Sequence, residues 1–369
     1  MTTLKSIHVE GFRSIRQADI PDLGPTTVLI GPNGAGKSNL IQLLKMVCMM
    51  TSGSLGLYVS NAGGASRLLH YGPKRTKQIE IRLEFVGGPL THLYEVGLGF
   101  AANETLVFHK ERTGLATGKG ALSVVWDELS AGHTEAGIRD EAGPSVGGVR
   151  QALERMNFFH FHDTSVNGPL RTNSSAEDSA YLRSDGRNLA TCLRTIQQGE
   201  DDGSRASWRR ISSLVSQVAP FIKELQPIPV DPLGRFLRLR WVDEQDEVFG
   251  PHDLSDGTLR AIALITALAQ PSSRLPSFVA IDEPELGLHP TAIRLLVELI
   301  RSVSSRCQVV LATQSPALLD HFEASEVIVA DRVAGESRFR RLDEHELSSW
   351  LDDYSLSQLY DKNLLGGRP

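Results

Sequence analysis

The chain has 369 residues, 41% of them hydrophobic and 22% charged, with a formal net charge of −6 and a pI of about 6.0. This composition indicates a globular protein of two or three domains and excludes a basic surface over the whole molecule, so any nucleic-acid contact must come from a local patch. The longest apolar run, residues 261–269, is too short to cross a membrane, the charged first 20 residues lack a signal-peptide core, and the three cysteines fit no zinc or disulfide spacing. We therefore expect a cytoplasmic protein with no membrane partner.

The first distinctive feature along the chain is a glycine-rich loop between an apolar strand and a helix. Residues 28–30 are apolar, residues 31–38 read G-x-x-x-x-G-K-S, and leucines then recur at helical spacing. Glycines let backbone N–H groups curl around phosphates, and the helix directs its positive end towards the anion. A chance match in a glycine-rich turn is the alternative, but the flanking strand and helix are those that a phosphate-binding loop (P-loop) requires.

This loop predicts a site for a nucleoside triphosphate and Mg²⁺. Lys37 would reach the outer phosphates and take part in catalysis, and the Ser38 hydroxyl would bind the metal. The residues expected to contact the nucleotide here are Gly31, Asn33, Gly34, Ala35, Gly36, Lys37, Ser38 and Asn39.

The segments that follow change from strands to helices. Alternating residues at 79–85 predict an antiparallel strand with partners at 93–100 and 106–112. The glycine-rich residues 130–148 predict a mobile loop. The later elements predicted here are helices at 189–196 and 208–222, the second kinked or divided at Pro220, and a strand at 236–241.

From residue 250 onwards the pattern is α/β. The predicted elements are helices at 257–269 and 290–305 and strands at 277–282, 308–312 and near 327–330. The first of these strands ends in Asp282, followed by Glu283, and such carboxylates can hold Mg²⁺ and orient an attacking water, respectively. A capping acid pair before a turn is the alternative. Because Asp282 lies so far along the chain from Lys37, a large insertion is expected to split one nucleotide-binding fold.

Two polar clusters complete this pattern. Ser255 and Gly257 stand at the start of the helix 257–269. A serine there is usually an N-cap, yet a serine and a glycine at a helix N-terminus also form an anion site. Gln314 follows the strand 308–312, where its amide can donate a hydrogen bond to a phosphate oxygen, the alternative being an ordinary polar strand end.

The order of these motifs resembles that of ABC-type ATPases. Residues 254–258 are similar to their signature motif, which contacts the γ-phosphate of ATP held by the other subunit, although Asp256 and Thr258 depart from the transporter form. Gln314 stands where these ATPases usually have a switch histidine. The segments Gly11–Ser14, Asp282–Glu285, Leu288–Pro290 and Ala312–Pro316 resemble the chromosome-maintenance and repair branch, which includes RecF, the SMC heads and the ATPase domains of OLD-family nucleases.

This resemblance covers residues 1–45 and 250–369 and implies an α/β, ABC-ATPase-like P-loop fold. The fold would have an N-terminal antiparallel β subdomain and a helical insertion. The expected domains are the first half of the ATPase head, the insertion, the second half of the head and a helical tail, at 1–125, 126–249, 250–345 and 346–369. No coiled-coil repeat is present, and too few residues follow position 330 for a Toprim nuclease domain, so any nuclease is expected to be a separate polypeptide.

The resemblance also implies a homodimer gated by ATP. Each ATP would lie between the P-loop of one copy and Ser255 and Gly257 of the other, and Glu283 would position the hydrolytic water. Arg13 would lie near the nucleotide, although a surface arginine after a strand fits the sequence equally well. His160 and His162, with Asp163, stand where this branch often has its Q-loop; core-edge histidines or a metal site are the alternatives.

DNA is the partner that the resemblance implies. The clustered basic residues are Lys74, Arg75, Lys77, Arg209, Arg210, Arg338, Arg340 and Arg341. Clusters of this size are usually solvated surface, so the expectation of DNA binding rests on the resemblance. Three functions are compatible with the sequence: a DNA repair or recombination ATPase, the ATPase of an anti-phage or toxin-like system that controls a separate nuclease, and a transporter subunit. The departures in the signature motif disfavour the transporter.

Overall fold

The computed structural model describes residues 2–117, 124–129 and 131–367, and these form two compact units. The first unit contains residues 1–156 and 310–369, and the second contains residues 157–309. The first unit therefore combines both ends of the chain, whereas the second is one continuous segment.

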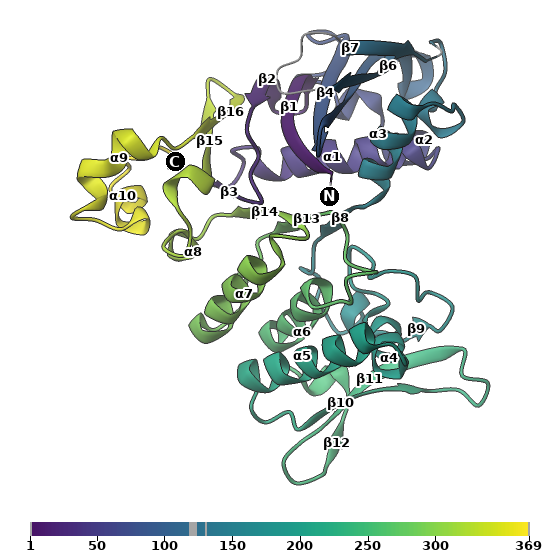
Figure 1. The fold of residues 1–369 in the computed structure, drawn as a ribbon, viewed down its shortest axis with the longest axis vertical. Helices are drawn as coiled ribbons and strands as arrows, with labels where there is room; N and C mark the ends of the chain where they lie inside the picture. Colours follow the sequence, from purple (N-terminus) through teal and green to yellow (C-terminus); the bar gives the residue numbers. More distant parts are fainter. Residues whose placement is uncertain (1, 118–123, 130, 368–369) are drawn as a thin grey trace. The chain divides into compact units, whose positions relative to one another are not determined.

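An antiparallel sheet forms much of the first unit, and its strand order is β2-β1-β4-β5-β6-β7 (Figure 1). Its strands are β1 (Thr3–Phe12), β2 (Ile15–Ile20), β4 (Gln78–Gly87), β5 (Leu90–Ala101), β6 (Thr105–Thr117) and β7 (Val124–Glu128). Along β4, Ile79, Ile81, Leu83 and Phe85 are buried, as their alternation with polar residues predicts. The predicted strands and their meander order are confirmed.

The strand before the P-loop, β3 (Thr26–Ile30), belongs to a different set of strands. It pairs in parallel with β15 (Val327–Val333), so that Val28 lies opposite Val327, and β16 (Glu336–Arg341) pairs antiparallel with β15. On its other side β3 is neighboured by β14 (Gln308–Thr313). The parallel pairing of β3 with a strand near the C-terminus shows that both ends of the chain contribute to one sheet, which is the arrangement that the predicted split requires.

The helices of the first unit are α1 (Lys37–Thr51), α2 (Leu55–Asn61), α3 (Pro144–Glu154), α8 (Pro316–Leu319), α9 (Glu344–Leu351) and α10 (Leu356–Asp361). The loop predicted at 130–148, of which residue 130 lies outside the described residues, is irregular at 131–143 apart from the short 3-10 turn Gly137–Arg139, but its last five residues belong to α3. Pro144 is the first residue of α3, a position where its fixed φ angle favours a helix. Val146 and Val149 are buried where α3 packs on β5 and β6. Long-range packing therefore makes the end of this glycine-rich segment helical.

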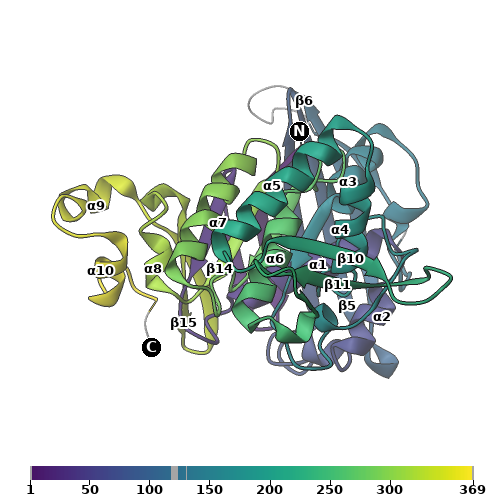
Figure 2. The same ribbon diagram turned by 90° about the horizontal axis from the view of Figure 1, so that it is seen from below.

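The second unit contains four helices among its described residues, α4 (Leu189–Gln198), α5 (Asp202–Val218), α6 (Asp256–Leu268) and α7 (Pro290–Val303). Helices α5, α6 and α7 lie side by side (Figure 2). The predicted helix at 208–222 ends at Val218, two residues before Pro220, because proline cannot continue the backbone hydrogen bonding. Within the part of the chain described, no helix is long and apolar enough to span a bilayer.

The segment predicted to be a helical insertion also holds a small antiparallel sheet. Its strands are β9 (Ser174–Ser175), β10 (Glu224–Pro229), β11 (Phe236–Val242) and β12 (Val248–Phe249), with β11 in the middle. Of these, the sequence predicts only β11. The unit also contains β8 (Met156–Phe159) beside β13 (Phe278–Asp282), which is the predicted strand that ends in Asp282.

Candidate nucleotide-binding and hydrolysis site

The P-loop connects β3 to α1 as the sequence predicts. Gly36 is the N-cap of α1 and has a φ angle of 109°, a backbone conformation that residues other than glycine rarely adopt. A Cβ atom at this position would lie 2.1 Å from Ser337 Oγ. Only glycine therefore fits here, and the helix begins with its backbone N–H groups directed towards the loop.

Lys37 is held at the loop by backbone oxygens. Its side chain is almost fully buried, and Nζ donates hydrogen bonds to the carbonyl oxygens of Gly31 at 2.6 Å and Pro32 at 3.1 Å. The ammonium group is thus kept beside the loop where the phosphates are expected. Ser38 and Asn33 are exposed, as residues that contact a ligand can be.

A cavity of about 580 Å³ lies next to the start of α1, and two predicted nucleotide contacts, Arg13 and Asn39, both line it. Arg13 Nε is buried and has no hydrogen-bond partner among the described residues. An unpaired buried donor is costly, and the oxygens of a bound nucleotide would satisfy it. The unpaired nitrogen and the adjoining P-loop make this cavity a fit for ATP.

The walls of this cavity are tied to the P-loop. Asn39 Nδ2 donates to Ser14 Oγ at 2.6 Å, and Ser14 Oγ lies 2.6 Å from Ser337 Oγ. Arg332, on β15, lines the same cavity and donates from Nη1 to the Gly34 carbonyl at 3.3 Å. The sequence analysis does not identify Arg332. Its place near the end of a strand parallel to β3 is the signal that could have found it, because ligands gather at that edge of such sheets.

The second unit holds the two acidic residues. Asp282 ends β13 with its side chain 14% exposed, and Glu283 has a φ of 48°, in the left-handed region. Two histidines surround Asp282: His160 Nδ1 lies 3.9 Å from its carboxylate, and His162 Nε2 donates to its backbone carbonyl at 3.1 Å. Sequence spacing alone does not place these histidines beside Asp282.

The signature segment begins α6. Ser255 is the N-cap, and its hydroxyl accepts a hydrogen bond from the Thr258 N–H at 3.1 Å, so the ordinary capping role is present. A Cβ atom on Gly257 would lie 2.0 Å from the carbonyl oxygen of Gly287, in the loop after Glu283. Glycine at this position is therefore required for the close approach of α6 and the loop that contains Gly287.

Two arginines that the sequence analysis misses hold this region together. Arg171 is buried, and its guanidinium donates to the carbonyls of Thr164 at 2.8 Å and Leu254 at 3.1 Å and to the Asp256 carboxylate at 2.8 Å. The hydrogen bond from Arg171 also holds the pKa of Asp256 below its ordinary value. The start of α6 is therefore fixed from the side of the protein interior.

Arg260, on α6 itself, reaches the two neighbouring loops. It donates to the carbonyls of Phe161 at 3.0 Å and His162 at 2.9 Å, and to that of Leu286 at 3.1 Å. The side chain of Arg260 thus joins α6 to two loops: the one that carries His160 and His162, and the one that follows Glu283. A single arginine in a helical pattern carries no sequence signal for such a role.

Replacing Arg171 with alanine should impair hydrolysis but not nucleotide binding. The P-loop lies in the other unit, whereas the start of α6 loses a charged donor, and each such hydrogen bond is worth roughly 1.5–3 kcal/mol. We expect turnover to fall by about tenfold or more. Steady-state ATPase assays and calorimetric titration with ATP measure the two effects. Arg183→Ala, which removes a more exposed pair with Asp178, is the control and should change neither. Equal losses of affinity and turnover in Arg171→Ala would contradict this role.

The remaining predicted residues are divided between the units. Gln314 directly follows β14 in the first unit and is exposed. The backbone on either side of it is held by a hydrogen bond from the Ser315 N–H to Thr313 Oγ1 at 2.9 Å. The first unit thus contains the P-loop, Arg13 and Gln314, and the second contains Ser255, Gly257, Asp282 and Glu283. A hydroxyl such as Ser38 and a carboxylate such as Asp282 are donors that suit Mg²⁺. Within the described residues, no group of three or more His, Cys, Asp or Glu side chains could hold a metal alone.

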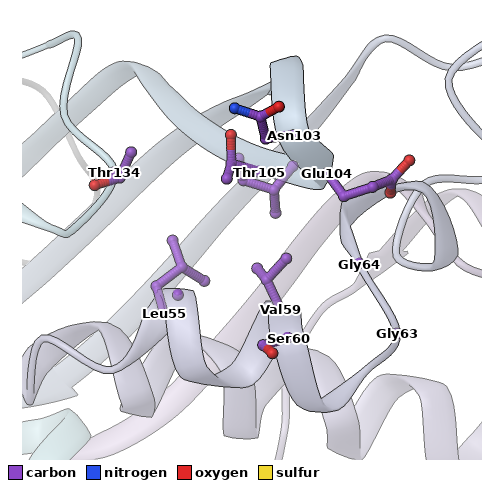
Figure 3. Close-up of a pocket in the computed structure, with 11 residues that line it drawn as sticks. Leu55, Val59, Ser60, Gly63, Gly64, Asn103, Glu104, Thr105 and Thr134 are labelled. Carbon is purple, nitrogen blue, oxygen red and sulfur yellow. The ribbon is translucent and has the colours of Figure 1, made fainter.

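A second cavity, of about 360 Å³, lies between α2 and the turn from β5 to β6 (Figure 3). None of the residues predicted from the sequence to bind nucleotide or metal, or to act in catalysis, lines this cavity. Its carboxylate, that of Glu104, accepts a hydrogen bond from the Ser66 N–H at 2.8 Å and so has a local structural partner. We assign no role to this cavity.

Comparison with protein families places ATPase models over most of the chain. Residues 6–167 match the family described as "AAA domain", and residues 160–320 match "AAA domain, putative AbiEii toxin, Type IV TA system". Together the two matches include the P-loop, the signature segment and the acidic strand.

The similar proteins of known name include two OLD nucleases and a RecF protein. The chain is 24% identical to an OLD nuclease of Thermus scotoductus (strain ATCC 700910 / SA-01) over 99% of its own length and 68% of that protein. It is 25% identical to the Old nuclease of Escherichia phage P2, over 88% of this chain and 58% of that protein. It is 24% identical to the DNA replication and repair protein RecF of Synechococcus sp. (strain JA-2-3B'a(2-13)), over 57% and 56%. The chain thus spans between about half and two thirds of these relatives.

Solved structures show the fold. An SMC head bound to the C-terminal winged-helix domain of ScpA matches with a TM-score of 0.58 and 16% identity, over 94% of this chain and 99% of that one. The Smc head with an extended coiled coil, from Pyrococcus furiosus, matches with a TM-score of 0.59 and 14% identity, over 96% and 99%. The two ATPase-domain matches, the OLD and RecF relatives and the SMC-head fold together support an ATPase of the RecF/SMC/OLD type.

Proposed function

We propose that two copies of this chain join head to tail around ATP and that the resulting switch serves DNA repair or recombination. The observation that carries the proposal is the start of α6, where the N-cap Ser255 is exposed although most of the helix is buried. Arg171 donates a hydrogen bond to the Leu254 carbonyl and Arg260 donates one to the Phe161 carbonyl, and these bonds fix the position of the exposed segment. Such a segment suits a γ-phosphate presented by a second subunit.

In this mechanism each residue has a separate task. Lys37 and the loop N–H groups bind the β- and γ-phosphates, and the amide of Gln314 donates to the γ-phosphate. Glu283 orients the attacking water and accepts its proton, while the start of α6 from the other copy stabilises charge on the transferring phosphoryl group. Bound Mg²⁺ would neutralise phosphate charge, with Ser38 and Asp282 as its protein contacts. The γ-phosphate distinguishes ATP from ADP, so hydrolysis would release the dimer.

The basic residues give limited support for direct DNA contact. Arg340 donates to the Leu365 carbonyl at 2.7 Å, Arg341 to that of Pro21 at 3.3 Å, and Arg75 stacks over the Tyr71 ring. Several of these side chains therefore have intramolecular roles. The proposal of DNA as a partner rests on the RecF and OLD relatives and on the fold.

The rate of ATP hydrolysis with and without duplex DNA tests this function. If the chain is a DNA repair ATPase, we expect DNA to raise the rate several-fold at low salt and less at high salt, because phosphate contacts release counterions. A rate that does not respond to DNA at any salt concentration would contradict the proposal. Poly-glutamate of equal charge is the control for nonspecific polyanion effects.

A second candidate is an ATPase that restrains a nuclease in an anti-phage or toxin-like system. The family description of residues 160–320 and the similarity to the Old nuclease of phage P2 favour it. In that case we expect ATP turnover indifferent to DNA and altered by a nuclease encoded beside this chain. The same assay, with that nuclease added, separates the two candidates.

A further inference from the structure

Residues 365–367, here called the C-terminal clamp, lie beside the first residue of the P-loop, although the two segments are at opposite ends of the chain. A Cβ atom on Gly367 would lie 2.8 Å from Val329 Cγ1, on β15, and 3.7 Å from Gly31 Cα. There is therefore no room for a side chain at position 367. The clamp lies directly against the end of β15 and the start of the P-loop.

Three hydrogen bonds attach the clamp to the first unit. The Gly367 N–H donates to Asp331 Oδ1 at 2.6 Å. Arg340 Nη2 donates to the Leu365 carbonyl at 2.7 Å. The hydroxyl of Tyr360, a buried residue of α10, donates to the Gly367 carbonyl. Because its acceptor is an ionised carboxylate, the bond to Asp331 belongs to the stronger class of hydrogen bond.

The end of β15, which the clamp holds, supports the P-loop on both sides of Asp331. The preceding residue packs against the loop, since a Cβ atom on Gly31 would lie 2.2 Å from the Ala330 carbonyl oxygen. The following residue, Arg332, donates from Nη1 to the Gly34 carbonyl at 3.3 Å and lines the cavity of about 580 Å³. Three consecutive residues thus connect the clamp with two points of the P-loop.

The tail that carries the clamp is also attached near Gln314. Helix α8 begins at Pro316, shortly after Gln314, and α10 packs against it. At the end of α8, Asp320 accepts hydrogen bonds from the Ser357 N–H at 2.8 Å and from the Ser357 hydroxyl at 2.6 Å. The tail therefore contacts both the loop predicted to bind phosphate and the helix that follows the predicted γ-phosphate contact.

We propose that the C-terminal clamp is a positioning element for nucleotide binding: the docked clamp holds the P-loop in its phosphate-binding conformation, and bound ATP in turn holds the clamp in place. The proposal rests on ATP binding at the P-loop. Because a coupling free energy between two sites acts equally in both directions, displacement of the clamp lowers the affinity for ATP by the factor by which ATP resists that displacement.

The effect of the clamp on ATP affinity is measured by calorimetric titration. Asp331→Ala removes the charged acceptor of the Gly367 N–H and should weaken ATP binding by about fivefold or more, as expected for coupling between distinct sites. Tyr360→Phe keeps the buried ring and loses only the hydroxyl, so a loss of about two- to fivefold is expected. Tyr354→Phe is the matched control: it makes the same change in the same tail, on a ring that contacts Lys362, and should not alter affinity.

The reverse effect is measured in the native chain by hydrogen exchange of the Gly367 amide, followed by mass spectrometry of C-terminal peptides. Saturating ATP should slow this exchange by about fivefold or more. A tail with a purely structural role would exchange at the same rate with and without ATP.

The coupling is overturned if ATP leaves the exchange of Gly367 unchanged, or if both Asp331→Ala and Tyr360→Phe bind ATP as tightly as the native chain. In these cases ATP still binds the native chain, and the P-loop assignment stands. If the native chain itself binds no ATP, the P-loop assignment fails, and the coupling fails with it.

Discussion

Replacement of Glu283 with glutamine should separate ATP binding from hydrolysis. The amide preserves the shape of the side chain but cannot accept a proton from water, and loss of a general base slows reactions by about 10²–10⁴-fold. Binding should persist, because the P-loop and Arg13 are unchanged. We therefore expect the variant to hold ATP without turning it over.

The same variant tests the dimer. If ATP bridges two copies, slow hydrolysis should cause an ATP-bound dimer of twice the 40.3 kDa chain mass to accumulate in size-exclusion chromatography with light scattering. Glu298→Gln, the same change at an exposed position of α7, is the control and should behave like the native protein. Monomer alone at saturating ATP would rule out the ATP-gated dimer, and undiminished turnover would rule out Glu283 as the base.

Replacement of Lys37 with alanine should remove most of the affinity for nucleotide. The ammonium group is the charged donor of the loop, and charge-assisted hydrogen bonds to phosphate are the strongest that the loop can make. We expect the affinity for ATP to fall by roughly a hundredfold or more. Calorimetric titration with ATP measures this loss, and hydrolysis should fall below detection.

The control for Lys37→Ala is Lys45→Ala, which removes a lysine from the same helix, away from the P-loop. This variant should bind ATP normally. Unchanged affinity in Lys37→Ala would refute the assignment of residues 31–38 as a phosphate-binding loop. Loss of affinity in both variants would point to a general effect on α1.

The sequence predicts the backbone elements around the candidate site correctly where the requirement is local. The P-loop depends on glycines at positions with unusual backbone angles, such as Gly36, and on a strand and helix immediately beside it. The acidic pair depends on a buried strand, β13, that ends at Asp282. Because these requirements fall within a few consecutive residues, spacing alone reveals them.

Prediction fails where the role of a residue depends on distant partners. Arg171 and Arg260 resemble any other arginine until packing brings backbone carbonyls from three loops around them. Residues 144–148 have the composition of a loop, but they begin α3 because β5 and β6 supply a surface for its valines. Tertiary contacts override local propensity in both cases.

The sequence by itself therefore determined the class of chemistry: a triphosphate-binding loop, an acidic strand end and a helix start arranged as in ABC-type ATPases. Only the tertiary structure decided that Arg13, Asn39, Tyr71 and Arg332 share one cavity. The physical reason is that a motif is a constraint on neighbouring backbone atoms, whereas a cavity is bounded by segments up to about 300 residues apart, as the pairing of β3 with β15 illustrates. Such distant segments meet only because burial of apolar surface stabilises one arrangement of the whole chain.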